Sequence, residues 1–176
     1  MIFTETNLKG AYVVGIEKLE DDRGFNARAV CQREFSAHGL ISQFVQANIL
    51  FNRKRGTLRG FHYQIPPCAE TKLFRCIRGS VFDVIIDLRP DSPTYKKWFG
   101  VELSADNYKM LYLPGNFAQG FITLADDTEL FYQVSEFYSP GYERGIRYND
   151  PAFAVEWPIP VEVMSTKDKS WPNYSD

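Results

Sequence analysis

Short apolar segments separated by turn residues run through nearly the whole chain, and each has the length of a strand. Helical periodicity is scarce: one short helix is expected over residues 33–38, with Gly39 as its C-terminal stop. Many short strands at close spacing are typical of an antiparallel barrel or jelly roll. Inward and outward side chains alternate in such a barrel, and a cavity inside it is the natural place for a small ligand. The expected strands are residues 24–30, 44–50, 57–64, 74–77, 81–86, 98–103, 110–113, 120–124 and 130–134.

Two turn signals indicate how neighbouring strands are connected. Gly79-Ser80 separates residues 74–77 from residues 81–86, and a Gly-X pair between two strand-like runs predicts a tight hairpin. Pro114-Gly115 follows residues 110–113. In that turn proline presets the second position, and glycine is expected to accept a positive φ at the third.

Composition narrows the class of protein. At 176 residues the chain fits one domain, residues 1–176, and 44% hydrophobic residues is ordinary for a globular protein. The 15% aromatic content suits strands and also a pocket that stacks on a flat ligand. A net charge of -2 gives no reason to expect nucleic acid as a partner, because domains that bind it are usually basic.

The expected compartment follows from what the sequence lacks. The cysteines, Cys31, Cys68 and Cys76, are odd in number and form no C-x-x-C pair, which favours a reducing compartment over a disulfide framework. The N-terminus has no basic region followed by an apolar run. No apolar run approaches the ~18 residues that span a membrane. We therefore expect a cytoplasmic protein with no membrane partner.

The histidines limit the chemistry. The chain has only two, His38 and His62, and no H-x-H pair. A transition-metal site in a barrel of this kind usually takes several imidazoles, so no metal site is predicted. An enzyme built on this chain is therefore expected to work with acid–base groups alone, without a metal or organic cofactor, which points to proton transfer.

His62 lies in the run 57–64 and has two interpretations. It is either a general base, since imidazole titrates near neutral pH, or a buried histidine satisfied by a backbone carbonyl. Arg59 three residues upstream and Lys72 ten downstream favour the base, because a histidine between two cations is poorly explained as core packing. Arg59 itself suits an anion such as a diphosphate. By strict alternation Arg59 and His62 face opposite sides, so they share a cavity only if Gly60 bulges or kinks the strand.

An ordered set of motifs resembles one enzyme family. Leu58-Arg59-Gly60-Phe61-His62-Tyr63-Gln64 is similar to the L-R-G-L-H-Y-Q signature of the dTDP-4-dehydrorhamnose 3,5-epimerases. Asp21-Asp22-Arg23-Gly24-Phe25 resembles the family's D-E-R-G-F, and Phe44-Val45-Gln46-Ala47-Asn48 resembles F-V-Q-D-N. The resemblance covers roughly residues 10–170 in the family order. It implies an all-β, cupin-like antiparallel jelly-roll β-barrel with one or two short helices.

The resemblance also implies roles for particular residues. His62 corresponds to the base that removes the proton beside the 4-keto group, and Asp168 to the carboxylate that orients that histidine. Lys72 corresponds to the cation that stabilises the enolate, and Tyr132 to the acid that returns a proton on the opposite face. From the residue pattern alone, Tyr132 would be assigned to the packing of a strand and Asp168 to the surface of the protein. The implied substrate-binding positions are Arg23, Arg28, Gln46, Asn48, Arg59, Gln119, Tyr138, Glu143 and Lys167, with Tyr138 stacking on the nucleotide base.

In the family the segment corresponding to Arg23 reaches into the partner subunit's site, which implies a homodimer. Two positions depart from the family pattern. Gln119 stands where the family has a histidine near the reacting sugar, and glutamine cannot take up a proton. Arg28 stands where the family has a glutamate.

The leading hypothesis is a metal-free isomerase that epimerises C3, C5 or both of a nucleotide-diphosphate-linked 4-keto-6-deoxyhexose, through an enolate, in deoxysugar biosynthesis. The most direct substrate is dTDP-4-dehydro-6-deoxyglucose. Gln119 and Arg28 leave open a single-centre epimerase for a different 4-ketosugar, such as a CDP-linked one. Two further hypotheses are a non-catalytic sugar-nucleotide-binding cupin and a cupin isomerase that moves the keto group between C3 and C4.

Overall fold

The computed structural model describes residues 1–175, so Asp176, the last residue of the predicted domain, lies outside the described residues. Nearly all of the regular structure in this range is strand. The strands are β1 (Ile2–Glu5), β2 (Tyr12–Gly15), β3 (Leu19–Asp21), β4 (Gly24–Asn26), β5 (Gln46–Asn52), β6 (Thr57–Gln64), β7 (Lys72–Arg78), β8 (Ser80–Asp87), β9 (Trp98–Ser104), β10 (Met110–Leu113), β11 (Phe117–Thr123), β12 (Thr128–Val134), β13 (Glu143–Gly145) and β14 (Val163–Met164). The helices are α1 (Gln32–Ala37), the 3-10 turn η1 (Pro140–Tyr142) and α2 (Thr166–Ser170).

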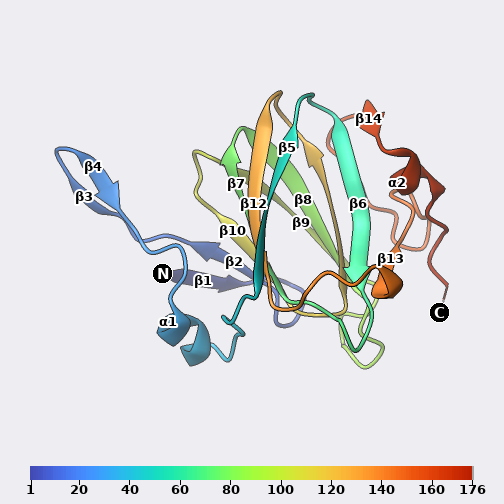
Figure 1. Ribbon diagram of the computed structural model, residues 1–176, viewed down its shortest axis with the longest axis horizontal. Coiled ribbons are helices and arrows are strands. Elements are labelled where there is room, and N and C mark those ends of the chain that lie inside the picture. The colour runs from blue at the N-terminus through green and yellow to red at the C-terminus, as the bar shows by residue number, and fades with distance from the viewer. Residues whose placement is uncertain (176) are drawn as a thin grey trace.

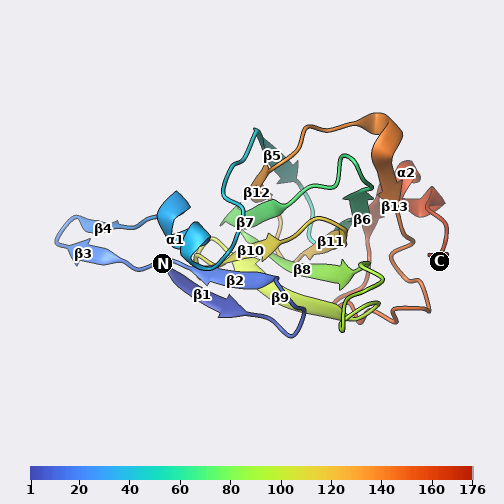
Figure 2. The same ribbon diagram turned by 90° about the horizontal axis from the view of Figure 1, so that it is seen from below.

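Two sheets face each other and form the body of the molecule (Figures 1 and 2). The first sheet has the order β1-β2-β10-β7-β12-β5, and the second has the order β13-β6-β11-β8-β9 with β14 beside β6. Every pairing is antiparallel except β14 with β6. Chain-distant strands alternate within each sheet, as in a jelly roll. The predicted all-β antiparallel jelly roll is confirmed.

Apolar side chains fill the space between the sheets at one end and cover the outer face of each. Leu111 and Leu130 of the first sheet meet Ile85 and Phe121 of the second in the central core. The C-terminal segment covers the outer face of the second sheet, and Phe153 is one of its side chains that pack there. Helix α1 covers part of the outer face of the first sheet. Apolar surface is therefore buried in three layers, one between the sheets and one on the outer face of each sheet. This burial fixes the position of the two sheets relative to each other.

Helix α1 agrees with the helix expected over residues 33–38, shifted by one residue. Phe35 is its buried residue and packs against Val14 and Met110. Gly39 follows the helix with φ of 69°, and its N–H bonds the carbonyl of Ser36, so glycine ends the helix as the pattern predicted.

Four expectations about the strands and their connections need correction. The hairpin predicted at Gly79-Ser80 is not formed, because the chain passes there from one sheet to the other, and β7 and β8 do not pair. The strand expected over 24–30 ends at Asn26, because it belongs to the β3–β4 hairpin, which leaves the body of the protein (Figure 1). The strand expected over 44–50 is β5, which begins at Gln46. In the Pro114-Gly115 turn the positive φ belongs to Asn116, at 65°, and not to Gly115. Asparagine tolerates the left-handed region better than most residues, so it takes that position.

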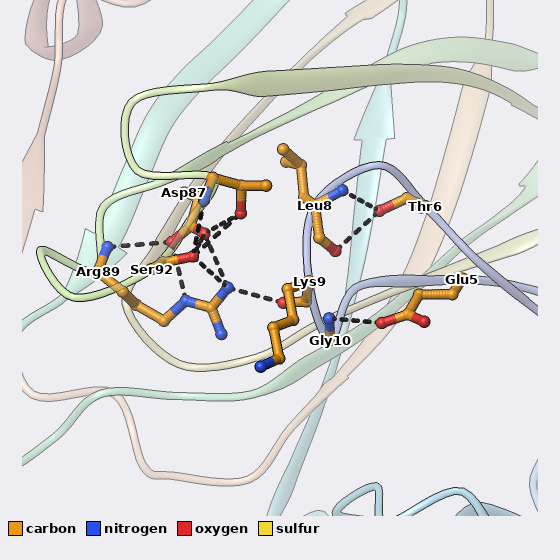
Figure 3. Close-up of polar contacts among 9 residues, drawn as sticks. Glu5, Thr6, Leu8, Lys9, Gly10, Asp87, Arg89 and Ser92 are labelled. Carbon is orange, nitrogen blue, oxygen red and sulfur yellow. Dashed lines mark hydrogen bonds and ion pairs between the residues drawn. The ribbon is translucent and has the colours of Figure 1, made fainter.

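A buried carboxylate ties the far end of β8 to the β1–β2 turn (Figure 3). Asp87 is 0% exposed and accepts hydrogen bonds from the guanidinium of Arg89 at 2.7 and 2.8 Å and from the hydroxyls of Ser92 and Thr94. Arg89 also donates to the carbonyl of Lys9 at 2.7 Å. Burial alone would raise the pKa of Asp87, but these donors outweigh it and lower the pKa to about 2.

The Asp87→Asn variant is expected to have a free energy of unfolding about 2 kcal/mol lower at pH 7, since each pKa unit is worth about 1.4 kcal/mol. A carboxylate whose folded pKa is depressed stabilises the fold above its unfolded pKa of 3.8, and this stabilisation is lost as pH falls toward about 2. Urea unfolding at several pH values tests it, with the exposed Asp91→Asn as the control. A difference between variant and wild type that does not shrink on acidification would contradict the assignment.

Candidate active site

A cavity of about 340 Å³ lies between the two sheets, beyond the end filled by the apolar core. Most of its lining residues carry polar side chains, and both sheets contribute. The lining residues are Gln46, Asn48, Leu50, Arg59, His62, Tyr63, Gln64, Glu70, Lys72, Phe74, Gln119, Phe121, Tyr132, Val134, Tyr138 and Glu143.

The register of the first sheet explains which of its side chains reach the cavity. Tyr132 of β12 pairs with Asn48 of β5 and with Phe74 of β7, so these three form one row across the sheet. Two residues along, Val134 pairs with Gln46 and Lys72 and forms a second row. Because side chains alternate with a period of two, both rows face the same way. The next row in the other direction, Leu50, Leu130 and Cys76, is apolar and closes the cavity against the core.

An irregularity in β6 brings Arg59 and His62 to the same side. On the neighbouring strand β11, Phe121 pairs with Arg59 and Gln119 pairs with His62, so two residues of β6 lie opposite the single residue Gly120. Gly60 has φ of 119°, and a Cβ there would lie 2.5 Å from the Cα of Gly120. Only glycine suits this backbone and this close approach. The bulge that a shared cavity requires is present, and Arg59 and His62 both line the cavity.

His62 is held by a carboxylate from the C-terminal region. Its Nε2 lies 2.5 Å from Oδ1 of Asp168, on the first turn of α2, and Ser165 caps this turn by accepting a hydrogen bond from the N–H of Asp168. Asp168 is 4% exposed. Burial would raise the pKa of Asp168, but the hydrogen bond and charge of His62 reverse this and lower it. With Nε2 engaged, Nδ1 is the nitrogen of His62 that can take a proton from a ligand.

Lys72 and Tyr132 belong to the first sheet, and they line the cavity opposite His62, which belongs to the second sheet. The Lys72 ammonium lies 3.1 Å from Oε1 of Glu70, and both side chains are largely buried. The Tyr132 ring packs against Phe74 at 5.4 Å between centroids. Burial is the main cause that raises the pKa of Tyr132, and the negative charge of Glu70 adds to it while Arg59 opposes it. Tyr132 is therefore protonated at neutral pH, as an acid must be.

Two predicted binding residues that line the cavity, Tyr138 and Glu143, meet a third, Lys167, which is not among the lining residues. Glu143 accepts hydrogen bonds from the hydroxyl of Tyr138 at 2.9 Å and from the ammonium of Lys167 at 2.6 Å. Burial acts to raise the pKa of Glu143, but these two donors lower it overall. Tyr138 is 53% exposed and lines the cavity, so its ring is accessible to a ligand.

Gln119, where a histidine was expected from the family pattern, is fixed by a carboxyl group behind it. Its Nε2 donates to the two oxygens of Asp83 at 2.9 and 3.2 Å. Complete burial raises the pKa of Asp83 to about 8, although Gln119 and the charge of Lys72 oppose the shift. With its amide nitrogen turned to Asp83, Gln119 can present its carbonyl oxygen to a ligand as an acceptor.

Besides Lys167, two more predicted binding residues do not line this chain's cavity. Arg23 sits at the tip of the β3–β4 hairpin, which extends away from the body (Figure 1), and its side chain is 89% exposed beside Asp21. Arg28 follows the hairpin, is 74% exposed and pairs with Glu34 at 3.2 Å. Neither can touch a ligand in its own chain's cavity in this arrangement.

Two acidic groups of the site, Glu70 and Asp83, were not predicted from the sequence. Asp83 carries a signal that could have revealed it, because it is a single carboxyl group within the apolar run 81–86, and such a residue is rarely buried without a polar partner. Glu70 lies in the connection after Pro66-Pro67, where nothing in the pattern marks it as buried.

Residues 1–175 contain neither a cluster of metal ligands nor a membrane-spanning helix. No three or more His, Cys, Asp or Glu side chains in this range gather as metal ligands would. The helices of the same range include none long and apolar enough to cross a membrane. The metal-free chemistry and the cytoplasmic location expected from the sequence stay predictions.

Comparison with known proteins gives consistent matches over nearly the full chain. A family model described as dTDP-4-dehydrorhamnose 3,5-epimerase matches residues 5–176. The dTDP-4-dehydrorhamnose 3,5-epimerase of Shigella flexneri is 44% identical over 157 residues, which are 89% of this chain and 86% of that protein.

Solved structures agree. The enzyme of the same name from Elizabethkingia anophelis superposes with a TM-score of 0.96 at 36% identity, covering 99% of this chain and 96% of that one. The one from Bacillus anthracis, with TDP and PPi bound, gives a TM-score of 0.94 at 39% identity over 98% and 99% of the two chains.

Proposed function

Because the chain belongs to the dTDP-4-dehydrorhamnose 3,5-epimerase family, a family of isomerases, we propose that it epimerises C3, C5 or both of a nucleotide-diphosphate-linked 4-keto-6-deoxyhexose in deoxysugar biosynthesis. The substrate proposed first is dTDP-4-dehydro-6-deoxyglucose. One observation supports this most: a carboxylate-paired histidine and a protonated tyrosine face one cavity from opposing sheets. That is the placement an inversion requires, since one group removes a proton from one face of the sugar carbon and the other returns a proton to the opposite face.

The proposed reaction uses this chain's own side chains and no cofactor. Nδ1 of His62 removes the proton beside the 4-keto group, and Asp168 stabilises the imidazolium that forms. The electron pair of the broken C–H bond moves onto the C4 oxygen, giving an enolate that the Lys72 ammonium stabilises. Tyr132 then donates its proton to the carbon from the other side. The new C–H bond restores the ketone with inverted configuration, and solvent returns both side chains to their starting protonation states.

The diphosphate, the base and the sugar of the substrate are proposed to bind at different positions along the cavity. Arg59, whose Nε donates to Asn52 at 2.8 Å and whose Nη2 donates to the carbonyl of Phe51 at 3.3 Å, presents its remaining N–H groups to the diphosphate. Tyr138 stacks on the base, with Glu143 and Lys167 around it. Gln46, Asn48 and Gln119 supply hydrogen-bonding groups for the sugar and its neighbouring phosphate.

A homodimer completes the proposal, because Arg23 cannot reach its own cavity. The hairpin that carries it exposes Leu19 at 73% and Phe25 at 39%. On the outer face of the first sheet, Ile49 and Phe51 are exposed at 63% and 45%. Exposed apolar side chains on the hairpin and on the sheet face of one chain suit a second copy of that chain. In such a dimer Arg23, and Arg28 beside it, would serve the partner's site.

The experiment that tests the function is incubation with dTDP-4-keto-6-deoxyglucose in D₂O, followed by NMR. We expect deuterium at C3, at C5 or at both, with no loss on exhaustive chelation. Incorporation at both carbons supports the double epimerase and shows that Gln119 is tolerated, whereas incorporation at one supports a single-centre epimerase. No exchange with this or with CDP- and other nucleotide-linked 4-ketosugars would favour a non-catalytic binding protein.

A further inference from the structure

A second buried ion pair, between Glu70 and Lys72, lies in the wall of the cavity, and the reaction described above gives no role to Glu70. Glu70 precedes β7, and its side chain is 12% exposed. Its Oε1 lies 3.1 Å from the Lys72 ammonium, which is 11% exposed, and its Oε2 accepts a hydrogen bond from Nε2 of Gln64 at 2.8 Å. Both carboxylate oxygens are thus engaged, one with the cation of the site and one with β6.

Gln64 extends this contact to the segment that carries Tyr138. Its Nε2 also lies within hydrogen-bonding distance of the carbonyls of Cys68, at 3.1 Å, and Phe137, at 3.2 Å. Its Oε1 accepts a hydrogen bond from the N–H of Ser139 at 2.6 Å. Phe137 and Ser139 flank Tyr138. Gln64 is 3% exposed, so these bonds are shielded from water and each is costly to leave unmade.

We propose that Glu70 is a positioning residue of the active site, whose carboxylate fixes the Lys72 ammonium toward the cavity and, through Gln64, joins it to the segment that carries Tyr138. A lysine has four flexible torsions, so a buried ammonium that must meet an enolate oxygen needs an anchor. The anchor also stabilises a cation that burial would otherwise disfavour. This inference rests on the proposed function for its catalytic consequence but not for its geometry.

The charge of Glu70 acts on a second group. Tyr132 from β12 lies near it, and the carboxylate adds to burial in raising the pKa of that phenol. The other charged or titratable groups facing this region are Arg59 and His62 from β6, Asp83 from β8 and Glu143 from β13. Arg59 opposes the effect of Glu70 on Tyr132. Removing the negative charge of Glu70 therefore lowers the pKa of Tyr132 and brings deprotonation of the proton donor closer to neutral pH.

The test is Glu70→Gln, which keeps the size of the side chain but removes its charge and one of its two acceptor oxygens. We expect kcat to fall about 10- to 100-fold with a smaller change in KM, and the alkaline limb of the kcat profile to move about half to one unit lower in pH. Glu70→Asp is expected to restore the position of the alkaline limb. Glu102→Gln, an exposed glutamate on β9 outside the cavity, is the matched control. Unchanged kcat and an unmoved alkaline limb in Glu70→Gln would overturn the proposal. A fall in kcat that is explained entirely by a lower melting temperature would overturn it as well.

A measurement without substrate separates this inference from the proposed function. Tyrosine labelled with ¹³C at Cζ reports phenol ionisation by NMR, and Tyr132→Phe assigns the signal. We expect the Tyr132 midpoint to be lower in Glu70→Gln than in the wild type and in Glu102→Gln. A shifted midpoint in a protein that turns over no 4-ketosugar would reject the function and keep the charge coupling. An equal midpoint in an active protein would reject the coupling and keep the function.

Discussion

The His62→Ala variant is expected to lose deuterium exchange at the sugar carbons by at least about 10³-fold while keeping its fold, because a positioned base contributes about 10²–10⁴ in rate and its loss also leaves Asp168 without its partner. NMR detection of exchange in D₂O measures the loss. Circular dichroism and thermal unfolding check the fold. His38→Ala is the matched control, since His38 is the other histidine, lies after α1 and does not line the cavity. Near-wild-type exchange in His62→Ala would remove His62 as the base.

The His62→Ala variant also tests whether Arg23 acts in the partner subunit's site. A dimer that pairs a His62→Ala chain with an Arg23→Ala chain contains one cavity with an intact His62 and an Arg23 from the other chain. If Arg23 acts in the partner's site, mixing the two variants under conditions that exchange subunits restores activity that neither has alone. Activity that stays at the sum of the two separate variants would place Arg23 outside the site of the partner.

The Tyr132→Phe variant is expected to keep proton exchange within about tenfold of the wild type while losing most of its inversion. The change removes only the phenolic hydroxyl, so His62 and Lys72 still form the enolate, which then takes its proton back from the original face. Comparing deuterium uptake with the appearance of inverted product separates the two steps. Tyr148→Phe, which removes a hydroxyl from a half-buried tyrosine outside the cavity, is the control. Equal losses of exchange and inversion would argue against this division of labour.

The strands that carry most of the site could be predicted because their signals are local. The run 57–64 matches β6 at both ends, and Gly79, with φ of 73°, makes a tight turn where one was expected, although β7 and β8 belong to different sheets and do not pair as a hairpin. The need for a bulge at Gly60 followed from the period of two in a strand together with the two cations around His62. Such inferences succeed because they depend on residues within a few positions of each other.

Features of the site that depend on residues far apart in the sequence were not predicted from the local residue pattern. Asp168 looks like a surface residue in a Lys-Asp-Lys run, yet it is buried against a strand more than a hundred residues away. Ser165 three residues before it forms a helix-capping pattern that could have revealed the short helix. The β3–β4 hairpin, with every residue exposed, has no buried face to give it an alternating pattern. Only the family resemblance indicated that Asp168 and Arg23 have a function.

The rows of side chains across β5, β12 and β7 have a consequence for how this protein can change. Each of these strands carries cavity-facing residues at alternate positions and outward-facing residues, such as Ile49 and Phe131, between them. Substitutions can therefore alter the lining of the cavity and the outer surface independently of each other. A one-residue insertion or deletion within β12 would instead exchange the two sets, turning Tyr132 outward and Phe131 into the cavity. New specificities on this scaffold are accessible through point changes within a fixed register, whereas length variation is confined to the loops and to the projecting hairpin.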